Sequence, residues 1–314
     1  MTVAQTLAPA GAHGGRPPAG RRRKRLRSRL EPLAYLSPTL AVMGVLMAVP
    51  IAMVIGFSFL SNVVMEKNPV FVGFSNYIKL FSDAVFWESA WNTLQFTVAC
   101  VAFHLLLGLA FAQMLNNRLI PKLMTAVFRV IYILPWVFTA AIVVILWRVI
   151  MNPNGVANFI LESLSLIQSK VEWFSDKDIA LGSLTFINIW AGYPFFMISL
   201  LAGLQGISPD LYEAASIDGA GPVKRFLHIT IPQLRPIIVS MAMLDFIWNV
   251  QQFALVFMIT GGGPVHATET LGTYTYKLAF GKYEFSMAAT SGVVLFLLSM
   301  AVAFFYVRSQ KARD

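Results

Sequence analysis

Three polar side chains share one face of an apolar segment near residue 250, where they could bind a hydrogen-bonding solute. Asp245, Asn249 and Gln252 are spaced by four and then three residues, and Trp248 lies beside them. Amide and carboxylate groups next to an aromatic ring suit the hydroxyl groups of a sugar or polyol. The same groups could instead hold this helix to its neighbours by hydrogen bonds. The sequence leaves both interpretations open.

A second apolar segment, residues 181–204, contains Asn188 and Tyr193, to which the same two interpretations apply. Neither this segment nor residues 237–260 contains lysine or arginine, the residues that bind phosphate and carboxylate groups best. Asp245 disfavours an anion further, because like charges repel. The pattern therefore favours a neutral sugar or polyol over glycerol phosphate, unless another chain supplies cations. Thr185 and His104 are expected to be structural.

The sequence contains no pattern typical of catalysis or metal binding. The phosphate-binding motif Gly-x-x-x-x-Gly-Lys-Ser/Thr is missing. Three consecutive glycines, residues 261–263, precede a proline with no lysine beside them, so they predict a turn. The four histidines share no metal-ligand spacing, and the single cysteine, Cys100, excludes an internal disulfide. We therefore predict that the chain is not an enzyme and holds no cofactor or metal of its own.

The composition indicates a protein that crosses a membrane several times. Hydrophobic residues make up 57% of the 314 residues and charged residues only 12%, whereas soluble domains carry about a quarter. A helix needs about 20 apolar residues to cross the hydrocarbon core. Six segments meet this length and predict an all-α polytopic protein with six transmembrane helices, over residues 35–60, 92–115, 126–150, 181–204, 237–260 and 286–307.

Basic residues are distributed unevenly between the two sides of these predicted spans. With the N-terminus in the cytoplasm, 17 of the 24 lysines and arginines are cytoplasmic and 7 are external, as the positive-inside rule requires. Residues 1–32 then form a basic cytoplasmic tail, and residues 308–314 form a second cytoplasmic tail. The basic run lacks the interleaved aromatic residues that stack on nucleic-acid bases. We expect it to set topology and to contact membrane lipid, not nucleic acid.

The segment between the fourth and fifth spans, about residues 206–236, predicts two short helices joined by an elbow. Ser208 is a good N-cap, and Pro209 suits the first helical position. The first helix should run to about Asp218, where Gly219 can adopt the left-handed conformation that ends a helix. The Gly-Pro pair that follows permits a sharp turn into the second helix, whose exit towards the fifth span is predicted at two further prolines.

The residues of this elbow resemble a known family motif. The first helix contains Glu213-Ala214-Ala215 and ends at Asp218-Gly219-Ala220. Four downstream residues complete the pattern: Phe226, Ile229, Pro232 and Pro236. Together, these residues are similar to the EAA loop of permease subunits in binding-protein-dependent ABC importers. Matching segments at residues 91–94, 260–264 and 288–291 extend the resemblance over roughly residues 33–307.

The resemblance implies an architecture and a set of partners. It implies a type I ABC importer permease fold of the maltose and glycerol-phosphate type, with a six-helix transmembrane domain over residues 33–307. A homologous second permease subunit, an ATPase subunit dimer and an extracytoplasmic solute-binding protein would complete the importer. ATP and magnesium would bind the ATPase partner. The complex would import a sugar or polyol across the cytoplasmic (inner) membrane of a bacterium or archaeon.

The resemblance also implies roles for the elbow. In that family the EAA loop docks in a cleft of the ATPase and transmits its closure to the membrane helices. Glu213 would contact the ATPase, and Gly219 would set the bend. The residues implied to couple are Glu213, Ala214, Ala215, Asp218 and Gly219.

Two other classes of protein are compatible with an apolar six-span chain. A secondary solute transporter often has inverted repeats and discontinuous helices, which the sequence does not show clearly. A membrane-embedded enzyme would need a cluster of catalytic residues, and the sequence shows none. A non-catalytic assembly factor would not need such a cluster. Copurification of an ATPase subunit under mild detergent would discriminate the importer from both.

Overall fold

The computed structural model describes residues 35–117 and 119–311. The described chain consists of helices and their connections, and it divides into two parts, up to Met53 and from Val54 onwards. The predicted basic tail, residues 1–32, and the end of the C-terminal tail, residues 312–314, lie outside the described residues. The helix Tyr35–Phe57 crosses this division, and the most apolar window within it has no buried residue. Lipid or another protein must cover a helix of this kind.

Five described helices are long and apolar enough to cross a membrane, and a bent pair brings the number to six. This confirms the prediction of an all-α polytopic fold. The long helices are Tyr35–Phe57, α4 (Ala84–Leu115), α8 (Ala180–Gln205), the continuous helix Pro222–Val250 and the C-terminal helix α14 (Phe285–Lys311). The bent pair consists of α5 (Lys122–Val137) and α6 (Ala140–Ile150).

The third predicted span, residues 126–150, is not one continuous helix, so that part of the prediction is wrong. Helices α5 and α6 meet at 98°, and Phe138 and Thr139 between them are extended. Pro135 lies in the last turn of α5. Its ring lacks a backbone donor and crowds the preceding turn, which weakens a helix at this point.

The fifth span begins and ends earlier than predicted. Its helix runs without interruption through Pro232 and Pro236, so the predicted exit at these prolines is wrong. A π-helical turn directly precedes Pro232, and membrane helices tolerate proline through such local adjustments. The helix stops at Val250, and a separate short helix follows. The segments are α10 (Pro222–Arg225), η2 (Phe226–Thr230), α11 (Ile231–Val250) and α12 (Ala254–Ile259).

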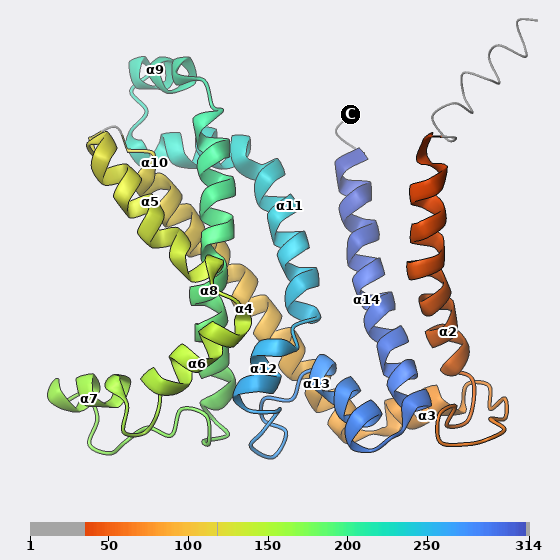
Figure 1. The fold of residues 1–314 in the computed structure, drawn as a ribbon. Coiled ribbons are helices and arrows are strands. Elements are labelled where there is room, and N and C mark those ends of the chain that lie inside the picture. Colours follow the sequence, from red (N-terminus) through yellow and green to blue (C-terminus); the bar gives the residue numbers. More distant parts are fainter. Residues whose placement is uncertain (1–34, 118, 312–314) are drawn as a thin grey trace, which may run out of the picture. The chain divides into compact units, whose positions relative to one another are not determined.

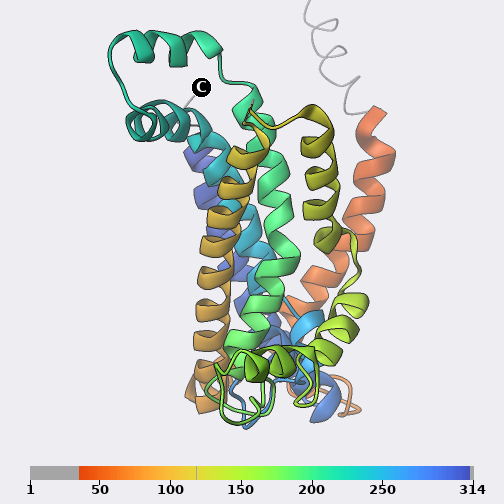
Figure 2. The same ribbon diagram turned by 90° about the vertical axis from the view of Figure 1, so that its left-hand side faces the viewer.

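Short helices gather at the two ends of the second part of the chain. Figures 1 and 2 show α9 (Pro209–Ile217) at one end, and α7 (Val156–Ser163), α12 and α13 (Leu271–Tyr276) at the other. The remaining short segments are α3 (Ser75–Ser82) and η3 (Lys277–Gly281). In the connection after α6, helix α7 ends at Ser163, and Ser165, with φ of 56°, follows its end.

Two glycines allow the helices of the second part to pack closely. Helix α4 packs along α8, and α11 packs against both. A Cβ on Gly108 of α4 would lie 2.4 Å from the Phe196 Cβ and 2.9 Å from the Met197 backbone nitrogen of α8. A Cβ on Gly192 of α8 would lie 2.4 Å from the His104 ring. Small residues at such crossings let membrane helices approach closely.

Apolar clusters lie on either side of His104 along α4. One cluster contains Phe96 and Cys100, and the other contains Ala112 and Leu115. Both clusters continue onto α8, so the two helices are held together above and below His104. This packing leaves the polar side chains near His104 facing one another inside the protein.

The close crossing predicts a specific sensitivity to added volume. Gly108→Ala places a methyl group against a Cβ and a backbone nitrogen, neither of which can rotate away, and overpacking of this kind costs about 1–3 kcal/mol. We expect a lower midpoint of thermal unfolding for the purified protein in detergent. Gly182→Ala on α8 is the matched control, because nothing described outside its own helical turn and chain neighbours lies within 4 Å of its Cβ position. Equal midpoints for the two variants would contradict the packing account.

Candidate functional site

Three helices, α4, α8 and α11, and the break after α11 bring five polar side chains together inside the second part of the chain. Asn188 Nδ2 donates to Asn249 Oδ1 at 2.6 Å, and Gln252 Nε2 donates to Asn188 Oδ1 at 3.3 Å. Asn249 Nδ2 donates to the backbone oxygen of Asp245 at 2.8 Å. All except Gln252 are buried. We call this set the polar cluster: His104, Asn188, Asp245, Asn249 and Gln252.

His104 is the member of the cluster that sequence reasoning did not select. Its Nδ1 lies 2.8 Å from Asp245 Oδ2, and its Nε2 lies 3.0 Å from the backbone oxygen of Asn188. The imidazole is 1% exposed. Asp245 therefore has a side-chain partner, His104, that the sequence analysis did not name. The signal available in the sequence was the presence of two ionisable residues of opposite type in apolar segments, where such residues usually pair.

A cavity of about 220 Å³ lies beside the polar cluster. Two helix breaks meet there: Pro135 and Phe138 line it from the bend between α5 and α6, and Gln252 lines it from the break after α11. Irregular backbone at membrane depth is tolerated where it lines a cavity. Trp248, which is half exposed, also lines this space. Among the described residues that line the cavity there is no lysine or arginine.

Tyr193 is the one predicted solute-binding residue that lies apart from the cluster. Its hydroxyl donates to the backbone oxygen of Tyr132 at 3.1 Å, and its ring lies 5.1 Å from the ring of Phe111. It is not among the residues that line the 220 Å³ cavity. In this structure Tyr193 joins α8 to α5, on a different side of α8 from Asn188.

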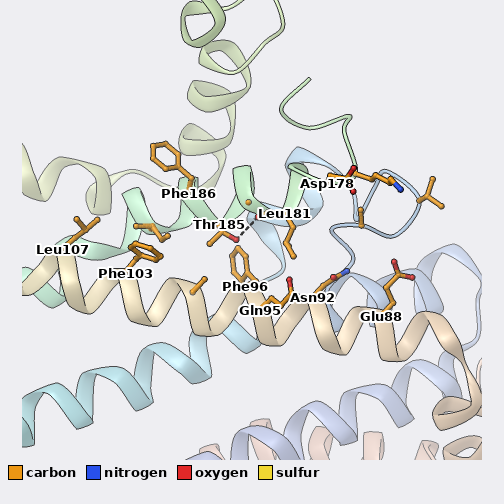
Figure 3. A pocket seen from close by; sticks show the side chains of 16 residues that line it. Glu88, Asn92, Gln95, Phe96, Phe103, Leu107, Asp178, Leu181, Thr185 and Phe186 are labelled. Carbon is orange, nitrogen blue, oxygen red and sulfur yellow. Dashed lines mark hydrogen bonds between the residues drawn. The ribbon is translucent and has the colours of Figure 1, made fainter. Parts of the chain in front are cut away.

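A larger groove of about 910 Å³ runs between α4 and α8 (Figure 3). One end of the groove is polar, with Glu88, Asn92 and Asp178, and further along it is lined by Phe103 and Leu107. None of the site residues predicted from the sequence lines this groove. The described residues contain no group of three His, Cys, Asp or Glu side chains suited to a metal ion.

The elbow has the predicted local structure. The Ser208 side chain accepts a hydrogen bond from the Asp210 backbone nitrogen, and Pro209 opens α9. Asp218 follows the last residue of α9, and Gly219 has φ of 76°. Helix α10 then begins with Pro222. The predicted boundaries of the first elbow helix and the left-handed glycine are confirmed.

The elbow is exposed and partly apolar. Glu213, Ala214, Asp218 and Gly219 are exposed, and Ala215 is half-buried. Large apolar side chains are exposed beside them: Ile217 is 87% and Val223 is 72% exposed. Exposed apolar side chains grouped with polar ones are typical of a surface that binds another protein.

Hydrogen bonds across the elbow tie α9 to the fifth span. Tyr212 Oη lies 2.9 Å from Thr230 Oγ1, a buried hydroxyl in η2. Arg225 Nη1 donates to Ser216 Oγ at 2.8 Å. A cavity of about 560 Å³ lies behind the elbow, lined in part by these side chains. The two bonds connect the exposed face of α9 with the base of the helix that carries Asp245.

At the opposite end, a buried carboxylate organises the segment that follows α12. Glu269 is 1% exposed; its Oε1 lies 3.0 Å from Lys277 Nζ, and Oε2 contacts His266. Asn92 Nδ2 donates to the backbone oxygens of both His266 and Glu269. Burial raises the pKa of Tyr274, whose hydroxyl donates to Asp83 Oδ2 at 2.7 Å. These bonds join α13 and its preceding turn to the start of α4.

Comparisons with known proteins agree with the elbow motif. Residues 104–313 match the family model described as "Binding-protein-dependent transport system inner membrane component". A trehalose/maltose transport system permease protein of Thermococcus litoralis is 32% identical, over 92% of this chain and 97% of that protein. A sulfoquinovosyl glycerol transport system permease protein of Agrobacterium fabrum is also 32% identical, over 92% and 93%. An inner membrane ABC transporter permease protein of Escherichia coli is 35% identical, over 86% and 90%.

Solved structures support the same fold. A chain of a bacterial ABC transporter that imports the acidic polysaccharide alginate matches with a TM-score of 0.78 at 22% identity, over 93% of this chain and 99% of that one. In such transport systems the permease crosses the inner membrane and a separate subunit hydrolyses ATP. The chain belongs to the inner membrane component family of binding-protein-dependent transport systems and is a permease subunit of an ABC importer.

Proposed function

We propose that this permease forms half of the translocation path for a neutral sugar or polyol, and that the path passes the polar cluster. The observation that carries the proposal is a cavity at two helix breaks, lined by neutral amides and Trp248. Amides both donate and accept hydrogen bonds, as hydroxyl-rich solutes require. Asn188, Asn249 and Gln252 are the amides assigned to this path, with Tyr193 and Asp245 as further candidates.

The cavity chemistry distinguishes between the solutes named for the relatives. Alginate is acidic, and recognition of an anion favours an arginine or lysine. The described lining of the cavity contains neither. A neutral solute such as trehalose or maltose, the sugars named for the Thermococcus relative, fits this lining better.

For the elbow we infer a coupling role. Glu213, Ala214, Ala215, Asp218 and Gly219 would form the docking face for a partner ATPase, which would bind ATP and magnesium. Their exposure and the exposed apolar neighbours support this role. The hydrogen bonds from α9 and α10 would let the elbow and the fifth span move together as a rigid unit.

We infer the orientation from the distribution of basic residues and the remaining partners from the family of the chain. We place both termini and the elbow in the cytoplasm, because 17 of the 24 basic residues then lie inside. The segments at the opposite end would face an extracytoplasmic solute-binding protein. A homologous second permease would supply the other half of the path, and an ATPase dimer would drive both. The domain division into residues 1–32, 33–307 and 308–314, with the elbow at about 206–236, belongs to the same proposal.

The orientation predicts which residues an impermeant thiol reagent can reach. In a Cys100→Ala background, Lys170→Cys should be labelled in intact cells, and Lys224→Cys should be labelled only after permeabilisation. Both lysines are exposed, so access to the two sides of the membrane decides the result. Labelling of the Lys224→Cys variant in intact cells would show that the proposed orientation is wrong.

The coupling role predicts a conformational sensitivity at Gly219. Gly219→Val should lower transport about tenfold, because a β-branched residue at positive φ costs on the order of 1–3 kcal/mol. Gly219→Asn is the matched control, since asparagine tolerates this conformation. Apart from its chain neighbours, no described residue comes within 4 Å of the Gly219 Cβ position, so a clash with another part of the chain does not affect the comparison. Solute uptake and the amount of chain in the membrane should be measured together. Equal uptake for both variants would remove Gly219 from the coupling role.

Glu213→Ala tests the docking face itself. Loss of an exposed carboxylate should reduce the amount of ATPase that copurifies with the permease, while the permease remains in the membrane. Lys67→Ala, an exposed charge in the segment between the first long helix and α3, is a control that should leave ATPase recovery unchanged. If ATPase recovery and uptake are normal for Glu213→Ala, the docking assignment is wrong.

The substrate path predicts weaker solute recognition on loss of amides. Asn249→Ala and Gln252→Ala should each raise the half-saturating solute concentration about five- to tenfold, because one hydrogen bond contributes about 1 kcal/mol. Uptake should be measured over a panel of sugars and polyols, with complex abundance in the same membranes. Ser199→Ala is a control, since among the described residues its hydroxyl donates to the Phe195 backbone oxygen of its own helix. Reduced abundance with unchanged half-saturation would show that the amides only join helices.

A further inference from the structure

His104 lies between two hydrogen-bond acceptors. A backbone oxygen only accepts, so His104 Nε2, at 3.0 Å from the Asn188 oxygen, must carry hydrogen. His104 Nδ1 lies 2.8 Å from Asp245 Oδ2. A second hydrogen must lie between these two atoms, because otherwise a nitrogen lone pair would face a carboxylate oxygen.

That second hydrogen can sit on either partner without changing the total charge. If it is on Nδ1, the pair is imidazolium and carboxylate; if it is on Oδ2, both groups are neutral. The pair carries no net charge in either case. Both side chains are buried, at 1% and 6% exposure, and an uncompensated charge at such a depth is costly.

The pair also holds the amides of the cluster. Asn188 accepts from His104 through its backbone oxygen, and Asn249 donates to the backbone oxygen of Asp245. The two amides then bond to each other at 2.6 Å. Gly192 leaves the space that the imidazole fills. Asn188, through its backbone oxygen, and Asn249, through its side-chain nitrogen, are therefore both joined to the pair.

We propose that His104 and Asp245 hold one proton between them as a net-neutral buried unit, and that this unit positions Asn188 and Asn249 for solute recognition. His104 is thus a positioning residue of the permease. The positioning role rests on the proposed substrate path, whereas the shared proton rests on the contacts of the pair alone.

The proposal makes the two partners unequal under substitution. Asp245→Asn can donate its amide hydrogen to Nδ1 of a neutral imidazole, while Nε2 still donates to Asn188, so every group stays bonded and uncharged. His104→Gln supplies no balancing proton and leaves a buried carboxylate. Adding Asp245→Asn to His104→Gln removes that carboxylate. The combined variant should therefore regain much of the thermal stability and complex abundance that His104→Gln lost.

The test is a double-variant comparison on the complex purified from native membranes through a tag on this chain. We expect His104→Gln to lower the midpoint of thermal unfolding and the amount of complex, and Asp245→Asn to change both little. The combined variant should recover most of the loss. His104→Gln with Glu172→Gln is the matched control, because Glu172 is exposed and cannot relieve a buried charge. If His104→Gln does not assemble, complex abundance in membranes still separates the variants.

The positioning role has its own measurement. With trehalose and maltose as probes of solute-stimulated ATPase activity, His104→Gln should raise the half-saturating concentration at least fivefold, and the combined variant should bring it back. An absence of rescue by Asp245→Asn, or equal damage by both single changes, would overturn the shared proton. Rescue of stability without any change in half-saturation would overturn the positioning role. If Asn249→Ala also leaves half-saturation unchanged, the proposed substrate path itself fails.

Discussion

The close crossing of α4 and α8 is the contact on which the polar centre of this permease depends. At Gly108 and Gly192 the helices approach so closely that a Cβ would meet a neighbouring atom at 2.4 Å. Only this separation lets the His104 imidazole lie within hydrogen-bond distance of both α8 and α11. In a bilayer no water is available to satisfy the same groups, so their bonds must come from neighbouring helices. The close packing at these glycines thus determines where polar side chains of different helices can form hydrogen bonds.

Two departures from regular helix meet at this centre. The bend after Pro135 and the break after Val250 both line the cavity beside the polar cluster. Each break exposes backbone groups that a continuous helix would satisfy internally, and such groups suit a solute path better than a lipid-facing surface. The lining combines amides and Trp248 with the His104–Asp245 pair, and it contains no described lysine or arginine. On the proposed path, with the pair net-neutral as we propose, a neutral solute would meet hydrogen-bonding groups without a strong electrostatic barrier.

The elbow differs from the buried polar cluster because it forms an exposed surface. Its residues are accessible, yet Tyr212 and Arg225 hold its two helices together by hydrogen bonds. The second helix of the elbow continues into the helix that carries Asp245 and Asn249. A displacement imposed on the elbow by a partner would therefore act on the polar cluster through one continuous element, without passing through a flexible linker.

The sequence by itself determined the all-α polytopic class, the boundaries of α9, the left-handed glycine and the absence of lysine and arginine from the two polar segments. These features follow from hydropathy, capping and turn preferences, which act over a few neighbouring residues. Only the tertiary structure decided that Asp245 pairs with His104, that Tyr193 faces α5, and that two spans break beside one cavity. Positions 104 and 245 are distant in the chain, so no local rule relates them. Their contact exists because glycines on α4 and α8 remove the volume that would otherwise keep the helices apart.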